Sequence, residues 1–147
     1  MEKKFKLNLR RANIVQIGYI YKDIEKQAEI MEAMYNLPKF QYYRSVRTKI
    51  KFRGKDSSYL AHIARNKLFN IDIELIQWIE GDCPHKEFLE QGKEGLHHIA
   101  ISPDDKESVI DDFKRKGIEV LMEWRLLELD GVYLDTEKSL GIILEIY

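Results

Sequence analysis

The spacing of apolar residues divides the first half of the chain into one helix among four strands. A mostly apolar run rich in β-branched and aromatic residues predicts a strand, and apolar residues at helical spacing predict a helix directly after it. Beyond Pro38, which ends the helix, apolar and polar residues alternate as in a half-exposed strand. The predicted elements are strand 14–21, helix 24–34 and strands 40–53, 58–64 and 71–78.

The second half repeats this order of elements after a short helical stretch at residues 86–91. Asp104 and Glu107 have the spacing of a capping box at the start of a second long helix, and Gly117 stands where that helix would end. The dipeptide Asp130-Gly131 is the strongest turn signal among the strands that follow. The predicted strands of this half are 96–102, 118–122, 131–134 and 142–147.

The two halves align as internal copies. Their matching segments include Asp23 and Asp105, which directly precede the two long helices. Two matches in the same order, inside the same pattern of elements, favour a repeat over chance. The other matched segments are 16–18 with 98–100 and 73–76 with 144–147. We therefore expect an α+β fold of two βαβββ modules in tandem within one domain, 1–147, with module 1 at about 12–80, a linker helix at about 84–92 and module 2 at about 95–147.

Polar side chains interrupt these apolar strands at matching positions of the two halves: Gln16, Glu74, His98 and Glu145. A carboxylate inside a buried strand is costly unless a partner compensates it, and no Lys or Arg lies in these four strands. Strand alternation puts Gln16 on the face of Gly18, and His98 on the face of Ala100. Because these neighbours are small, we expect both polar side chains to line a cavity.

One divalent metal ion would satisfy all four polar side chains. Two carboxylates neutralise its charge, and the imidazole and the amide oxygen complete a set of four protein ligands, leaving two adjacent positions for a substrate that presents two oxygens. Such a site stabilises an enediolate or a thioester enolate, so the sequence predicts a proton-transfer site that holds Zn, Co, Ni or Mn. Each residue alone would more often be structural, and the repeat is what favours the metal site. His97 is expected to point to the opposite face and to pack or form hydrogen bonds there, with an exchange of the roles of His97 and His98 as the alternative.

Other polar and aromatic residues have ordinary structural interpretations. The cationic positions Arg47, Lys49, Lys51 and Arg53 form one face of a strand; they suit protection of an edge strand better than binding of a CoA phosphate, which stays the alternative. His62 is expected in the core or on the surface, with a role as a second acid or base as the alternative. Trp78, Trp124, Tyr42 and Tyr43 are expected in the core or an interface.

Composition excludes several classes of partner. The 147 residues carry 24 basic and 25 acidic side chains, and a formal net charge of −1 argues against nucleic-acid binding. No run is long and apolar enough for a membrane span, and the charged residues 1–11 lack the apolar core of an export signal. The single cysteine, Cys83, excludes an internal disulfide and a Cys-based zinc site. We expect a cytoplasmic protein that works in water on a small molecule.

The paired modules and their motifs resemble the vicinal oxygen chelate superfamily, which includes glyoxalases, bleomycin-resistance proteins and dioxygenases. The resemblance covers about 14–147 and rests on Val15-Gln16-Ile17-Gly18, Ile73-Glu74-Leu75, Gly95-Leu96-His97-His98-Ile99-Ala100 and Gly141-Ile142-Ile143-Leu144-Glu145. Within the superfamily the second half is most similar to methylmalonyl-CoA epimerase. The resemblance implies a curved mixed sheet around a cavity, and homodimers are common among such proteins.

The resemblance carries the family's metal positions onto Gln16, Glu74, His98 and Glu145. It implies a metal-dependent epimerase that removes the α-proton of an acyl thioester such as methylmalonyl-CoA, with Glu145 as the first choice of catalytic base and Glu74 as the second. Epimerases more often have His where this chain has Gln16, and the set Gln, Glu, His, Glu is that of glyoxalase I. A lactoylglutathione lyase is therefore one alternative, and a metal-free binding protein like the bleomycin-resistance members is another. The absence of His at position 16 argues against a ring-cleaving dioxygenase.

Overall fold

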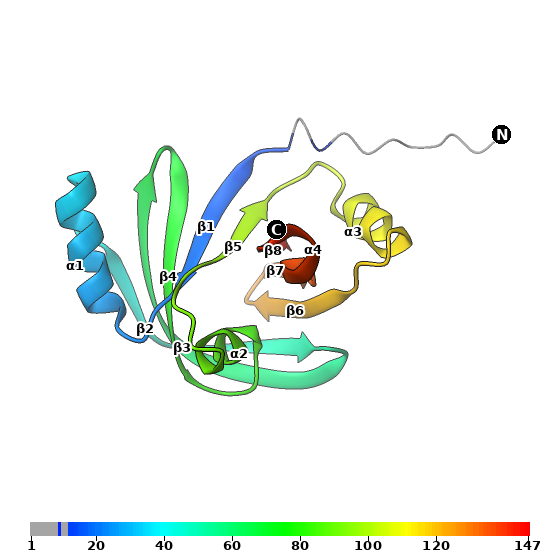
Figure 1. Cartoon of the computed structure of the whole chain (residues 1–147), viewed down its shortest axis with the longest axis horizontal. Coiled ribbons are helices and arrows are strands. Elements are labelled where there is room, and N and C mark those ends of the chain that lie inside the picture. Colours follow the sequence, from blue (N-terminus) through cyan, green and yellow to red (C-terminus); the bar gives the residue numbers. More distant parts are fainter. Residues whose placement is uncertain (1–8, 10–11) are drawn as a thin grey trace.

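The computed structural model describes residue 9 and residues 12–147, which form a mixed α+β fold (Figure 1). The expectation that the first eleven residues lack an export signal falls largely outside this part. The described strands are β1 (Ile14–Ile20), β2 (Gln41–Phe52), β3 (Lys55–Leu68), β4 (Ile71–Glu80), β5 (Gly95–Ile101), β6 (Val120–Leu126), β7 (Leu129–Leu134) and β8 (Ile143–Ile146). The described helices are α1 (Ile24–Tyr35), α2 (Pro84–Glu90), α3 (Lys106–Arg115) and the short α4 (Glu137–Leu140), which the sequence patterns did not predict.

The eight strands close into a barrel in the order β1-β4-β3-β2-β6-β7-β8-β5. β1 pairs with β4, and β5 with β8, in parallel; the other pairs are antiparallel. The two halves of the chain therefore meet at two seams, β1 with β5 and β2 with β6. The expected curved mixed sheet is confirmed, and both seams bring strands of the two halves side by side.

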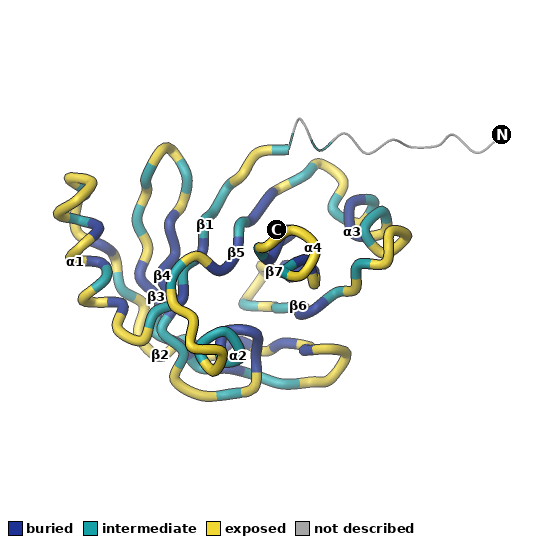
Figure 2. The backbone as a smooth tube through the Cα atoms, in the orientation of Figure 1, coloured by how far each residue is buried: buried dark blue, intermediate teal, exposed yellow. Residues whose placement is uncertain are grey.

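Apolar residues fill the barrel and cover its outer face under the two long helices. Tyr59, Met122 and Tyr133 belong to the interior cluster, while Ile24 and Val109 anchor α1 and α3 to the outer faces of the first and second halves. Figure 1 shows α1 and α3 on opposite sides of the molecule, and Figure 2 shows the buried positions of each helix facing the sheet. The helices thus leave the barrel interior to the strands.

The repeat alignment identifies both helix caps correctly, but the predicted capping box is wrong. The carboxylates of Asp23 and Asp105 accept hydrogen bonds from the backbone amides of Lys26 and Ser108, at 3.1 and 3.0 Å. The helix starts one residue later than the Asp104 pattern predicts, because Asp105 has the non-helical backbone (φ −122°) that a cap requires.

The predicted turn at Asp130-Gly131 is also wrong. Both residues lie in β7, and the chain reverses instead at residues 127–128, where Leu127 adopts φ +56°. Gly131 is needed for space: a Cβ there would lie 2.6 Å from Nε1 of Trp124. The glycine therefore allows the indole to lie against β7, which matters for the site described below.

The cationic face of β2 is exposed as predicted, but β2 is not an edge strand. Residues 49–52 pair with β6 on one side and with β3 on the other. Arg47 forms an ion pair with Glu80, and Arg53 binds Glu87 of α2 through two hydrogen bonds of 2.5 and 3.0 Å. Protection of a sheet edge therefore does not explain this face. No helix in the described part of the chain is long and apolar enough to cross a membrane.

Candidate active site

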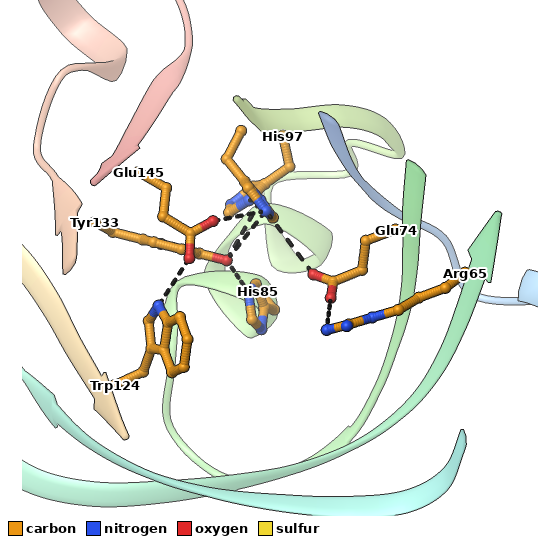
Figure 3. A network of polar contacts seen from close by, with 8 residues as sticks. Arg65, Glu74, His85, His97, Trp124, Tyr133 and Glu145 are labelled. Atoms are coloured by element: carbon orange, nitrogen blue, oxygen red, sulfur yellow. Dashed lines mark hydrogen bonds and ion pairs between the residues drawn. The ribbon is translucent and has the colours of Figure 1, made fainter. Parts of the chain in front are cut away.

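Three of the four predicted ligands lie together inside the barrel. His98 on β5 has its Nε2 3.9 Å from Oε1 of Glu74 on β4 and 3.4 Å from Oε2 of Glu145 on β8. All three residues are buried, and His98 is fully enclosed. Figure 3 shows the two carboxylates on opposite sides of the cluster.

The sheet register explains why these residues converge. Gly18 pairs with both Glu74 and His98, so these three residues form one row across β4, β1 and β5. Ala100 pairs with both Gln16 and Glu145, which forms a second row across β1, β5 and β8. The rows lie two residues apart on β1, on the same face of the strand. The repeat therefore places equivalent residues of the two halves next to each other.

Gly18 makes room for the central histidine. A Cβ on this glycine would lie 2.0 Å from Cε1 of His98 and 2.2 Å from its Nε2, far inside van der Waals contact. The imidazole therefore lies directly over the backbone of β1, and the expectation that Gly18 leaves space on the inner face is confirmed.

Gln16 lines the same cavity as the two carboxylates. The cavity has a volume of about 70 Å³, and its wall also contains Tyr59, Trp124 and Tyr133. Gln16 is half-buried, and within the described residues its side chain forms no hydrogen bond. The fourth predicted ligand is thus on the cavity wall, with its amide free to bind a ligand.

Glu145 has one bound and one unbound oxygen. Nε1 of Trp124 donates a hydrogen bond of 2.7 Å to Oε1. Oε2 is buried and has no hydrogen-bond partner among the described residues. Burial, and next the charge of Glu74, raise the pKa of this carboxyl to about 8. An orphaned buried carboxylate oxygen calls for a proton or a cation.

Glu74 has a cationic neighbour that the sequence patterns missed. Nη2 of Arg65 on β3 donates a hydrogen bond of 2.9 Å to Oε2 of Glu74. Burial raises the pKa of Glu74, and the charge of Arg65 opposes that shift. The strand pattern could have identified Arg65. The side chains of Tyr59, Ala61 and Ile63 alternate onto the inner face of β3, and continuing this alternation puts residue 65 on the same face.

The expectation that His97 points away from His98 is wrong. The register between β1 and β5 shifts between the pairs Gly18–His98 and Tyr19–Leu96, so His97 is the extra residue of a β-bulge. Nδ1 of His97 lies 3.1 Å from Nδ1 of His98, and both rings lie near that of Tyr133. A bulge breaks the alternation of side chains, which is why the strand pattern failed at this position.

A buried layer behind His98 was also missed. The hydroxyl of Tyr133 on β7 lies 3.3 Å from Nδ1 of His98 and 3.1 Å from Nε2 of His85 on α2 (Figure 3). Burial lowers the pKa values of His85 and His98 to about 3, so both imidazoles are neutral near pH 7. Nothing in the sequence pattern of α2 singles out His85.

The remaining predicted candidates lie outside this cluster, with one exception. His62 is half-exposed, and its Nδ1 accepts a hydrogen bond of 2.9 Å from the backbone of Ser45. Trp78 donates to the carbonyl of Gly81 at 2.8 Å. Trp124 is the exception, because it reaches the cavity and holds Glu145.

Residues 15–132 match the family model of the Glyoxalase/Bleomycin resistance protein/Dioxygenase superfamily. The chain belongs to this superfamily. The resemblance seen in the sequence motifs is therefore confirmed at the level of the superfamily. Comparison with curated protein sequences finds no match.

Several solved structures share the fold of this chain. A methylmalonyl-CoA epimerase in complex with methylmalonyl-CoA and NH₄⁺ has a TM-score of 0.64 at 20% identity, covering 92% of each chain. A variant of the Streptomyces coelicolor methylmalonyl-CoA epimerase in complex with 2-nitronate-propionyl-CoA has a TM-score of 0.63 at 20% identity, covering 91% of this chain and 92% of that one. A hypothetical protein from Bacillus halodurans has a TM-score of 0.64 at 17% identity, covering 92% and 93%. At these identities the similarity establishes the fold.

The predicted ligands offer an amide oxygen, an imidazole nitrogen and two carboxylates, and these donor types and their charge suit a divalent metal ion. The ligand atoms of one ion, each about 2.1 Å from it, lie roughly 3 Å apart at right angles, and the Nε2 of His98 is 3.4 and 3.9 Å from the two carboxylate oxygens. The neutral imidazole and the orphaned Oε2 of Glu145 are free to coordinate. Within the described residues no group of three His, Cys, Asp or Glu side chains is already close enough to hold an ion. The carboxylate farther from His98 is that of Glu74, which forms an ion pair with Arg65. Gln16, Glu74, His98 and Glu145 would hold the ion.

Proposed function

We propose that this protein is a metal-dependent epimerase that moves the α-proton of a small acyl thioester such as methylmalonyl-CoA. One observation carries the proposal: two buried carboxylates flank a neutral histidine, and the oxygen of Glu145 nearest that histidine has no other partner. A divalent ion held there would polarise the thioester carbonyl and stabilise the enolate that forms when the proton leaves.

Each side chain of the site has a task in this proposal. Glu145, which would serve as ligand and base together, accepts the α-proton, while the hydrogen bond from Trp124 to Oε1 fixes the orientation of the carboxylate. Glu74, on the opposite side of the cavity, would carry the proton that is returned to the other face of the α-carbon (Figure 3). Ile63 and Ile76 form an apolar part of the wall, and Gln16 would complete the donor set.

A deuterium wash-in experiment tests the reaction. Protein loaded with Co²⁺ or Zn²⁺ and incubated with methylmalonyl-CoA in D₂O should place deuterium at the α-carbon. Glu145→Gln should slow the exchange by roughly 10² or more, the range for loss of a general base. The matched control is Glu123→Gln, which removes an exposed carboxylate on β6 and should leave the rate unchanged. No exchange by the metal-loaded wild-type protein would contradict the proposal.

Two other functions are supported by specific observations. The donor set Gln16, Glu74, His98 and Glu145 matches the pattern implied for a lactoylglutathione lyase, so conversion of the glutathione hemithioacetal of methylglyoxal without exchange of methylmalonyl-CoA would favour that enzyme. The Arg65–Glu74 ion pair favours a metal-free binding protein, because it compensates Glu74 without an ion. Tight binding of a planar antibiotic by metal-free protein, with neither activity, would favour that function.

The proposal includes a homodimer in a reducing compartment. The only cysteine of the chain, Cys83, is free and buried at the start of α2, and burial raises the pKa of its thiol to about 11. A thiol of that kind is inert and needs no oxidising environment.

Light scattering coupled to size-exclusion chromatography tests the proposed homodimer, and a mass of one chain would contradict it.

A further inference from the structure

Arg65 is the only cationic side chain that lines the cavity in the described part of the chain. It stands on β3, across the cavity from Trp124, and Figure 3 shows its guanidinium ending beside Glu74. Half of the side chain is exposed, whereas the side chain of its partner Glu74 is 11% exposed. The guanidinium therefore lies at the boundary between the cavity and solvent.

Most of the hydrogen-bonding capacity of this guanidinium is unused. It carries five N–H groups in a rigid fork, and within the described residues only Nη2 donates a hydrogen bond, to Oε2 of Glu74. The ring of Tyr43 lies 5.9 Å from Cζ and supports the guanidinium from one side. Arg65 can thus bind a second carboxylate without releasing the first.

The charges of the site also favour an anionic group on the substrate. A divalent ion and Arg65 together bring three positive charges. Glu74 and Glu145 bring two negative charges at most, and only one while Glu74 carries the proton that it returns. At least one positive charge is left over in the cavity, where it is costly unless an anion neutralises it. A single carboxylate on the substrate supplies that charge.

Part of the cavity wall is apolar. Leu126 and Leu129, from the β6–β7 hairpin, line it, and Leu129 is 51% exposed. A substrate carbon that carries a carboxylate toward Arg65 and a small alkyl group toward these leucines matches both walls. The volume of about 70 Å³ suits a short alkyl group.

We infer that Arg65 is a specificity-determining residue that binds a carboxylate on the α-carbon of the substrate, which restricts the substrates to 2-carboxyacyl thioesters with a short alkyl branch. The inference rests on the proposed function for the thioester and the metal, and it adds the residue that selects the acidic branch. Arg65 binds and orients this group and takes no part in the proton transfer.

A pair of probes isolates the carboxylate. Methylmalonyl-CoA and propionyl-CoA differ in this group alone, so the ratio of their dissociation constants, measured by calorimetry, reports its recognition. The measurement is made on chelator-treated protein, in which no metal ion contributes to the binding of either probe. It is repeated on metal-loaded protein. The wild-type protein should bind methylmalonyl-CoA at least tenfold more tightly in both forms, the range of a charge-assisted hydrogen bond.

Four variants decide the role of Arg65. Arg65→Gln should reduce the preference to less than about twofold, whereas Arg47→Gln, which removes an arginine on the outer face of β2, should keep it. Glu74→Gln frees Arg65 and should increase the preference in metal-free protein. The double variant Arg65→Gln/Glu74→Gln removes both partners of the ion pair, so neither is left unpaired. It tests the same loss if Arg65→Gln alone fails to fold.

The possible outcomes separate this inference from the proposed function. A preference that persists in Arg65→Gln or in the double variant overturns the role of Arg65, whatever the deuterium exchange shows. A preference that disappears in these variants supports it, even if the wild-type protein exchanges no deuterium and the epimerase proposal fails. Equal binding of both probes by wild-type protein overturns it directly.

Discussion

The raised pKa of Glu145 predicts an unusual dependence of stability on pH in metal-free protein. Burial and the charge of Glu74 raise this pKa from 4.5 to about 8. Between these two pH values the folded protein holds a proton that the unfolded chain has released, so the free energy of unfolding falls as pH rises. One pKa unit corresponds to about 1.4 kcal/mol, and the whole shift therefore amounts to about 5 kcal/mol.

Glu145→Gln removes this dependence and keeps the local geometry. The amide oxygen still accepts the hydrogen bond from Trp124, and the amide cannot ionise. Urea unfolding of chelator-treated protein at pH 5, 6, 7 and 8 should show wild-type stability falling relative to the variant by roughly 1 kcal/mol per pH unit. Glu123→Gln, on the exposed face of β6, should follow the wild type. Parallel curves for wild type and Glu145→Gln would refute the reasoning.

Three further predictions follow from the surroundings of His98. Gly18→Ala should lower the free energy of unfolding by about 1–3 kcal/mol in urea titrations and weaken metal binding, because the new Cβ overlaps the imidazole; unchanged stability would contradict this packing. Tyr133→Phe should weaken metal affinity by roughly 10- to 100-fold in calorimetry, since the hydroxyl beside Nδ1 of His98 is lost, and an unchanged affinity would remove Tyr133 from the site. Metal affinity should fall as pH drops below about 6, because protons compete for the carboxylates and imidazole; a pH-independent affinity would contradict this donor set.

The sequence predicts the two matching modules and their equivalent polar positions because both depend on the repeat, whereas the curved sheet was implied by the resemblance to the superfamily. Matching Gln16 with His98 and Glu74 with Glu145 identifies equivalent positions, and closing the sheet through β1 and β5 brings these positions together. Neither step needs knowledge of side-chain packing. The elements and the polar residues in them could therefore be predicted from periodicity and alignment alone.

The features that the sequence did not predict depend on tertiary contacts. The inward position of His97 requires a bulge, which shifts the register of β5 against β1 and has no signal in the strand pattern. His85 reaches Tyr133 only because α2 packs against the barrel, and Arg65 meets Glu74 only because β3 and β4 pair in that register. These residues surround the predicted site and decide how its carboxylates are balanced.

A metal titration tests the central claim most directly. Chelator-treated wild-type protein, titrated with Co²⁺ or Zn²⁺ in a calorimeter, should bind one ion per chain, and His98→Ala should abolish this binding. His62→Ala, which removes a histidine outside the cavity, should bind one ion as the wild type does. A wild-type protein that binds neither ion, or a His98→Ala variant that binds one ion with unchanged affinity, would contradict the account.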